Sequence, residues 1–148
     1  MIGRVSIAKE ARERIQWGVV LDLRLHQLDG LRRARIEPYV PGLAQGLRES
    51  FPEELAAVDD DALRAQVMEG ALRAMGHGLR TPRDIGRFLN LQVVLGWSFD
   101  EDDPRAARAL RDPAVPEPSR RLDRLVKAAI ARLRIEERNA QLRREFDR

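Results

Sequence analysis

The spacing of apolar residues along the chain predicts helices, and two of them are clear. One is expected to begin after the acidic residues 59–61 and to end between Gly76 and Gly78, because acids favour a helix start and glycine a helix end. Its apolar positions recur three or four residues apart: Leu63, Val67, Met68, Ala71, Ala74 and Met75. The other begins at Ser119 and carries an apolar stripe over three turns: Leu122, Leu125, Val126, Ala129, Ile130 and Leu133.

A third helix is predicted from Pro82 to about Leu95. Thr81 can cap it, Pro82 suits its first position, and Asp84 can reach back to the cap as the third residue. Its apolar residues cover almost the whole circumference, which predicts a helix buried among others. They are Ile85, Phe88, Leu89, Leu91, Val93, Val94 and Leu95.

The N-terminal part of the chain is harder to assign. Residues 7–17 keep helical spacing, and residues 1–27 form a possible N-terminal extension. Segment 19–26 alternates like a strand but also fits a helical face, and we favour a helix because no partner strand is near. A helix over 28–37 should break at Pro38 and Pro41, and Pro41-Gly42 can open the next one toward Phe51.

Between the helix expected over 82–95 and the one that begins at Ser119, the chain contains residues that break helices. Gly96-Trp97-Ser98-Phe99 should end the central helix, and residues 100–104 should begin one short helix carrying Leu110. Residues 112–118 hold three prolines and predict an extended connector. The expected fold is therefore all-α: one domain over 1–148, a compact bundle of about five to six helices with a buried central helix near 82–95 and a long C-terminal amphipathic helix.

Composition narrows the class of protein. The chain has no cysteine, which excludes disulfides and thiolate metal sites, and it contains no apolar run of about eighteen residues and no visible export signal. We therefore expect a cytoplasmic protein that does not cross a membrane. The 27 basic and 24 acidic residues give a net charge of only +3, and almost all the basic residues are arginine, as in proteins from GC-rich bacterial genomes.

The chain lacks the residue pattern of a common enzyme or metal site, and no cofactor is expected. The acidic run 100–103 has neither the alternate spacing nor the closing glutamate of a calcium loop, so capping before Pro104 is favoured. His77 should supply a charge or donor near a helix end, and His26 should lie on the surface. An enzyme acting through scattered carboxylates such as Asp84 and Asp100 remains an alternative.

A second alternative is nucleic-acid binding. Residues 71–90 follow the order helix, glycine-containing turn, helix, which superficially matches a helix-turn-helix. However, a recognition helix must present a polar face to DNA, and the helix after Pro82 is apolar nearly all round.

Candidate partner-binding residues lie in two places: just after the expected central helix, and in the charged C-terminal tail. Trp97 and Phe99 are aromatic residues of the kind that dominate interface hot spots, although core packing is the alternative for both. The charged tail 134–148 is either a solvated helix end, held by pairs such as Glu136 with Arg132, or a docking arm. The residues proposed there are Arg134, Arg138, Leu142 and Phe146.

Four segments together resemble a known group of proteins: Phe51-Pro52-Glu53, residues 60–70 with Ala74, residues 78–91, and Gly96-Trp97-Ser98-Phe99-Asp100. The chain resembles, over about residues 28–133, small all-helical bacterial proteins encoded near type VI secretion or polymorphic-toxin effector loci. His77 stands where an aromatic residue is more usual in that group, and the resemblance assigns no functional residue. It implies a non-enzymatic adaptor, chaperone or co-adaptor whose partner is an effector, another adaptor or a spike component, with its oligomeric state left open.

Overall fold

The computed structural model describes residues 30–147, and all regular secondary structure in this part of the chain is helical. The interpretations made for 7–17, 19–26 and the extension 1–27 lie outside the described residues. The chain divides into one unit that ends at Pro38 and a second that begins at Tyr39, and each is described by itself. The described part of the first unit is a helix over 30–36, which passes into the short 3-10 helix η1 (Glu37–Tyr39).

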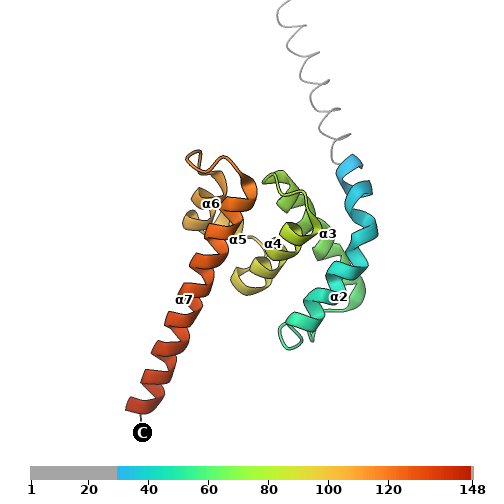
Figure 1. Cartoon of the computed structure of the whole chain (residues 1–148). Helices are drawn as coiled ribbons and strands as arrows, with labels where there is room; N and C mark the ends of the chain where they lie inside the picture. Colours follow the sequence, from blue (N-terminus) through green and yellow to red (C-terminus); the bar gives the residue numbers. More distant parts are fainter. Residues whose placement is uncertain (1–29, 148) are drawn as a thin grey trace, which may run out of the picture. The chain divides into compact units, whose positions relative to one another are not determined.

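Within its described residues the second unit is an all-helical bundle, as the sequence predicts (Figure 1). Its helices are α2 (Val40–Ser50), α3 (Asp60–Gly76), α4 (Pro82–Leu95), α5 (Phe99–Asp102), α6 (Pro104–Arg111) and α7 (Pro118–Phe146).

The starts of α3 and α4 follow the capping signals in the sequence. The Asp59 carboxylate accepts the Ala62 N–H at 2.7 Å, and the Thr81 hydroxyl oxygen accepts the Asp84 N–H at 3.2 Å. The expected return contact from Asp84 to the cap is wrong. Its carboxylate instead accepts the Ser119 hydroxyl at 2.7 Å, because Asp84 is buried where α4 meets the start of α7.

The single short helix expected after Phe99 is two helices, α5 and α6. Asp103 separates them in an extended conformation, which the following Pro104 favours since a residue before proline avoids the helical region. The Asp103 carboxylate caps α6 by accepting the Arg105 N–H at 2.9 Å. The capping role predicted for the acidic run is therefore confirmed at Asp103.

Helix α4 is the centre of the bundle and contacts α2, α3, α5 and α7. Ile85, Phe88 and Leu89 on it are each at most 2% exposed. The predicted burial on all sides is wrong: Asn90 is exposed, and in the last turn Val94 is exposed and Leu95 is only half-buried. The surrounding helices leave one side of this turn open, and Leu95 lines hollows beside α6 and α7.

Helix α7 packs with its first half only. Leu122, Leu125 and Ala129 are buried, whereas Ile130 and Leu133 are exposed, so only the first part of the predicted apolar stripe is packed. The helix continues without a break to Phe146 and, in Figure 1, its red end runs on beyond α4 and α6. The stripe fails at Ile130 because α4 and α6 cover α7 only up to about Ala129.

Two arginines hold the irregular connections. Arg48 on α2 donates to the carbonyl oxygens of Leu55 and Val58, at 3.1 and 2.5 Å. Arg121 on α7 donates to the carbonyl oxygens of Leu110 and Val115, at 3.2 and 2.5 Å. Each guanidinium thereby donates to carbonyl oxygens that accept no hydrogen bond within a helix.

The close approach of α3 and α4 depends on Gly70. A Cβ atom at this position would lie 2.6 Å from Leu89 Cδ2 and would also overlap the side-chain amide of Gln92. We expect Gly70→Ala to lower the free energy of unfolding by up to about 2 kcal/mol, because overpacking costs roughly 1–3 kcal/mol and the gain in helix propensity offsets only about 1 kcal/mol of this. Urea unfolding followed by circular dichroism measures this.

The matched control is Gly46→Ala in α2, where a Cβ atom would meet nothing within 4 Å. This variant should be up to about 1 kcal/mol more stable than the wild type. Equal gains in both variants would show that α3 and α4 do not rely on the missing side chain.

Candidate interaction surface

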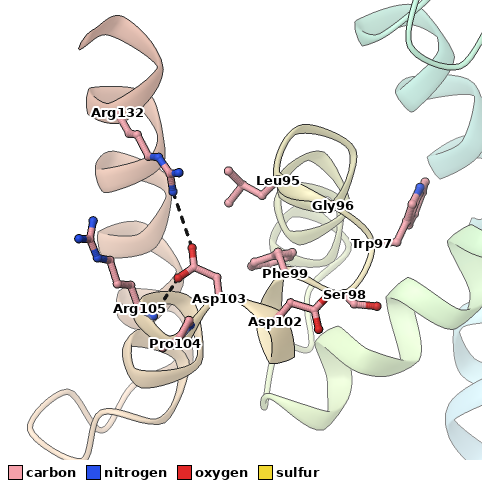
Figure 2. Close-up of a pocket in the computed structure, with 10 residues that line it drawn as sticks. All are labelled: Leu95, Gly96, Trp97, Ser98, Phe99, Asp102, Asp103, Pro104, Arg105 and Arg132. Atoms are coloured by element: carbon pink, nitrogen blue, oxygen red, sulfur yellow. Dashed lines mark hydrogen bonds and ion pairs between the residues drawn. The ribbon is translucent and has the colours of Figure 1, made fainter. Parts of the chain in front are cut away.

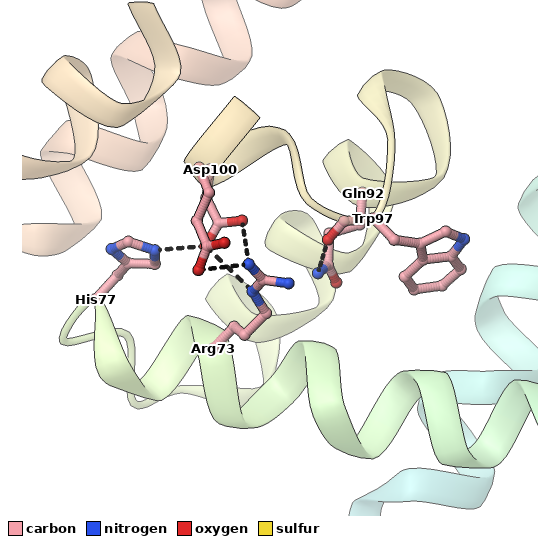
Figure 3. A network of polar contacts seen from close by, with 6 residues as sticks. Arg73, His77, Gln92, Trp97 and Asp100 are labelled. Atoms are coloured by element: carbon pink, nitrogen blue, oxygen red, sulfur yellow. Dashed lines mark hydrogen bonds and ion pairs between the residues drawn. The ribbon is translucent and has the colours of Figure 1, made fainter. Parts of the chain in front are cut away.

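A buried carboxylate ties the end of α3 to α5. Asp100 is 3% exposed, and its Oδ2 lies 2.9 Å from His77 Nε2 and 3.3 Å from Arg73 Nε (Figure 3). Arg73 also lies 3.3 Å from Asp100 Oδ1 and 2.9 Å from Glu101. The Phe88 ring contacts the rings of His77 and Phe99 in tilted arrangements, at centroid distances of 5.7 and 5.2 Å.

This cluster shows the role of His77 that the sequence predicted. His77 is the residue that follows the last turn of α3, as predicted, and the structure adds Asp100 as its partner. The pairing could not be read from the sequence, because 23 residues separate the two side chains. No group of three or more potential metal ligands occurs among residues 30–147.

A second ionic contact joins α4 to α7. Arg87 Nη1 lies 2.6 Å from an Asp123 oxygen and 3.6 Å from an Asp84 oxygen. The hydrogen bond from Arg87 lowers the pKa of the Asp123 carboxyl below its usual value, as do the charges of Arg87, Lys127 and Arg83, against an opposing effect of desolvation. Asp84 and Asp100 thus belong to two separate groups of contacts, each engaged with residues of another helix.

A groove of about 710 Å³ lies between α6 and α7. Small side chains line it from both helices, and apolar side chains stand at its sides. We call it the α6–α7 groove; the residues used below are Leu95, Ala106, Ala109, Ala128, Ala131 and Ile135.

Charged residues form the rim of the α6–α7 groove. Arg105, Arg124 and Arg132 supply positive charge, and Asp103 and Glu136 supply negative charge. Arg132 contacts both acids, at 3.8 Å to Asp103 and 3.2 Å to Glu136, which confirms the predicted pair with Glu136. Figure 2 shows the Arg132 guanidinium directed at the Asp103 carboxylate, and both side chains line an adjoining hollow of about 640 Å³.

The two aromatic candidates for partner binding have different positions. Phe99 is a core residue, 2% exposed, so its proposed role as a partner anchor is wrong. Its position at the start of α5 turns the ring inward onto Phe88. Trp97 is half-buried in the α4–α5 turn, where its carbonyl accepts the Gln92 side-chain amide, and its indole points away from Arg132 in Figure 2.

The four candidates on the C-terminal half of α7 are all exposed: Arg134, Arg138, Leu142 and Phe146. Leu142 is 45% exposed and Phe146 is 87% exposed. They are four residues apart and therefore share one face of the helix. The structure brings these two together but leaves Trp97 in a different part of the unit.

Sequence reasoning missed Ile135 and the alanines of the groove. Ile135 is 60% exposed and stands seven residues before Leu142, on the same face of α7. The spacing of Ile135, Leu142 and Phe146 was available as a signal in the sequence. The alanines were not recognisable, because only the packing of α6 beside α7 makes a groove of them.

The α3–turn–α4 segment does not have the surface of a DNA-reading motif. Its second helix would have to enter the major groove, yet α4 packs against four neighbouring helices. The residues that would face bases are in the protein core, including Phe88 and Leu89.

Comparisons with known proteins give no relative on which to base a function. No protein family, no curated protein and no solved structure matches the chain. Among the described residues, no helix combines the length and apolar character needed to cross a membrane.

The Asp100 cluster should be a main source of stability. We expect Asp100→Ala to lower the free energy of unfolding by roughly 2–3 kcal/mol, since it removes a buried partner of two polar side chains. Glu101→Ala is the matched control: Glu101 contacts the same Arg73 but is exposed, so the loss should stay below about 1 kcal/mol. Equal losses in urea unfolding would contradict the dominance of the buried contact.

The lowered pKa of Asp123 makes one contribution to stability depend on pH. A carboxyl whose pKa is lowered by folding stabilises the folded state fully at pH values above its usual pKa of 3.8. This stabilisation is lost as the pH falls through the lowered pKa. Asp123→Asn should therefore lower the urea midpoint at pH 7, and the difference from the wild type should shrink in acid. In an Arg87→Gln background this pH-dependent difference should largely disappear; a difference that persists there would point to another cause.

Proposed function

We propose that this protein is a non-catalytic protein-binding module, and that the α6–α7 groove binds a helical segment of a partner protein. The groove is the observation that carries the proposal. Its volume of about 710 Å³ and its small lining residues leave room for the side chains of another helix. Apolar recognition with a polar rim is the usual composition of such a site.

The chemistry of the groove indicates the kind of segment it would accept. Ala106 and Ala109 on α6 oppose Ala128 and Ala131 on α7, and Leu95 and Ile135 add apolar surface at the edges. An amphipathic helix could insert leucine or phenylalanine side chains between these residues. Arg105 and Arg124 on the rim favour acidic residues beside the apolar stripe of that helix.

Other features agree with a binding role. The carboxylates that could have served catalysis, Asp84 and Asp100, hold helices together through Ser119, Arg87, Arg73 and His77. The resemblance to proteins of type VI secretion and toxin loci supports an adaptor, chaperone or co-adaptor. In that role the bound segment would belong to an effector, another adaptor or a spike component.

Co-purification from the native host tests the proposal. Tagged wild-type protein should recover an effector, adaptor or spike component encoded beside it. Ala131→Glu should reduce that recovery at least tenfold, because a charged side chain would stand in the apolar groove. Recovery of the partner is measured by quantitative mass spectrometry.

The matched control is Ala65→Glu, which changes an exposed helical alanine on α3 that does not line the groove. It should recover the partner as the wild type does. The proposal fails if the wild type recovers no such component while a neighbouring protein of the same locus behaves normally. It also fails if both variants bind equally well.

A further inference from the structure

An apolar stripe runs along the protruding half of α7 on the side turned away from the core. Leu142 lies twenty residues after the buried Leu122, and at 3.6 residues per turn this separates their directions by roughly 200°. Ile135, Leu142 and Phe146 are exposed by 60%, 45% and 87%. No described residue covers this stripe, although it contains some of the largest exposed apolar side chains of residues 30–147.

The stripe has the spacing of a two-stranded coiled coil. Positions 128, 132, 135, 139, 142 and 146 are separated alternately by four and three residues, and all six are exposed. This spacing keeps one face of a helix directed at a partner helix. Asn139 stands in the middle of the stripe, where a polar residue is known to select one arrangement over others.

We propose that this stripe pairs with the same stripe of a second copy of the chain, with the two α7 helices antiparallel. In this arrangement Ile135 lies opposite Phe146 of the other copy, and Asn139 lies opposite Leu142. Two-fold symmetry repeats each contact, so the pair consists of four side-chain layers. The pairing does not use the groove alanines, and it shares Ile135 and the rim residue Glu136 with the α6–α7 groove. The tests below therefore use Ala131 and Leu142, each of which belongs to one surface only.

The charges beside the stripe determine both orientation and register. In an antiparallel pair Glu136 faces Arg143 of the other copy, and Arg138 faces Glu145, so all four flanking contacts are attractive. A parallel pair instead places Arg138 opposite Arg143 on both sides. Like charges at these positions oppose the parallel arrangement.

Other antiparallel registers are rejected by the same residues. A shift by one heptad in one direction places Glu136 opposite Glu136 and Arg138 opposite Arg138. A shift in the other direction places Arg143 opposite Arg143 and Glu145 opposite Glu145. Only the register that pairs Ile135 with Phe146 has opposite charges on both flanks.

Sedimentation equilibrium on the full chain tests the self-association. Only a few layers are in contact, so we expect a weak monomer–dimer equilibrium, as is usual for a small interface. Leu142→Glu should weaken it at least tenfold. Gln141→Glu, which adds the same charge one residue earlier and outside the stripe, should leave it within about twofold. A wild type that stays monomeric at millimolar concentration would overturn the proposal.

Charge exchange tests the orientation. Arg138→Glu should weaken an antiparallel dimer at least fivefold, because the introduced carboxylate would face the carboxylate of Glu145 in the other copy. In a parallel dimer the same substitution would relieve a repulsion and strengthen association. Adding Glu145→Arg to this variant should restore the wild-type dissociation constant. Strengthening by the single substitution, or no recovery in the double variant, contradicts the proposed pairing.

Cysteine cross-linking tests the register directly, since the chain contains no cysteine of its own. Under mild oxidation a mixture of Ile135→Cys and Phe146→Cys proteins should form a disulfide-linked dimer. Either variant alone should remain uncrosslinked, because its two thiols would be eleven residues apart along the pair, about 16 Å at 1.5 Å per residue. Cross-linking of each variant alone would show a parallel pair and overturn the inference.

These outcomes are separable from the groove proposal. Ala131→Glu should abolish partner recovery and leave the dissociation constant of the dimer unchanged. Leu142→Glu should do the reverse. If both substitutions affect both measurements alike, the two surfaces are one site and the self-association is not independent of partner binding.

Discussion

The fold depends on the need to cover α4. Leu89 and Leu91 are both buried although residues two apart on a helix point in nearly opposite directions, so no single neighbouring helix can remove both from water. Helices α2, α3, α5 and α7 pack around it, and the short turns between them keep neighbours in the sequence adjacent in space. The groove and the protruding half of α7 occur where this coverage ends.

The helix ends could be predicted because their causes are local. Asp59, Thr81 and Pro82 act on backbone groups within three residues of themselves, and the structure places the helix starts where these residues indicate. The contacts of Asp84 and Asp100 could not be predicted, since their partners are 35 and 23 residues away. The sequence expectation of a capping role therefore failed at both Asp84 and Asp100, because each side chain binds residues of another helix instead.

The candidate site shows the same division between local and long-range information. The exposure of Leu142 and Phe146 could be anticipated, because charged residues surround them in the sequence. Phe99 was misassigned because an aromatic residue after a helix end has no local mark of burial. The packing against Phe88 that helps to bury it is a tertiary contact. The α6–α7 groove arises in the same way. Its alanines cannot be recognised as groove residues in the sequence, because the groove exists only where α6 and α7 lie side by side.

The high arginine content, which the sequence analysis linked to a GC-rich genome, also has a structural role. Arg48 binds two carbonyl oxygens of the segment that connects α2 to α3, and Arg121 binds one in the last turn of α6 and one in the segment that follows it. Every amino acid carries a carbonyl, so these contacts place no demand on which side chains the connecting residues have. The two segments can therefore diverge in evolution, and change the surface they present, while the arginines keep their paths fixed.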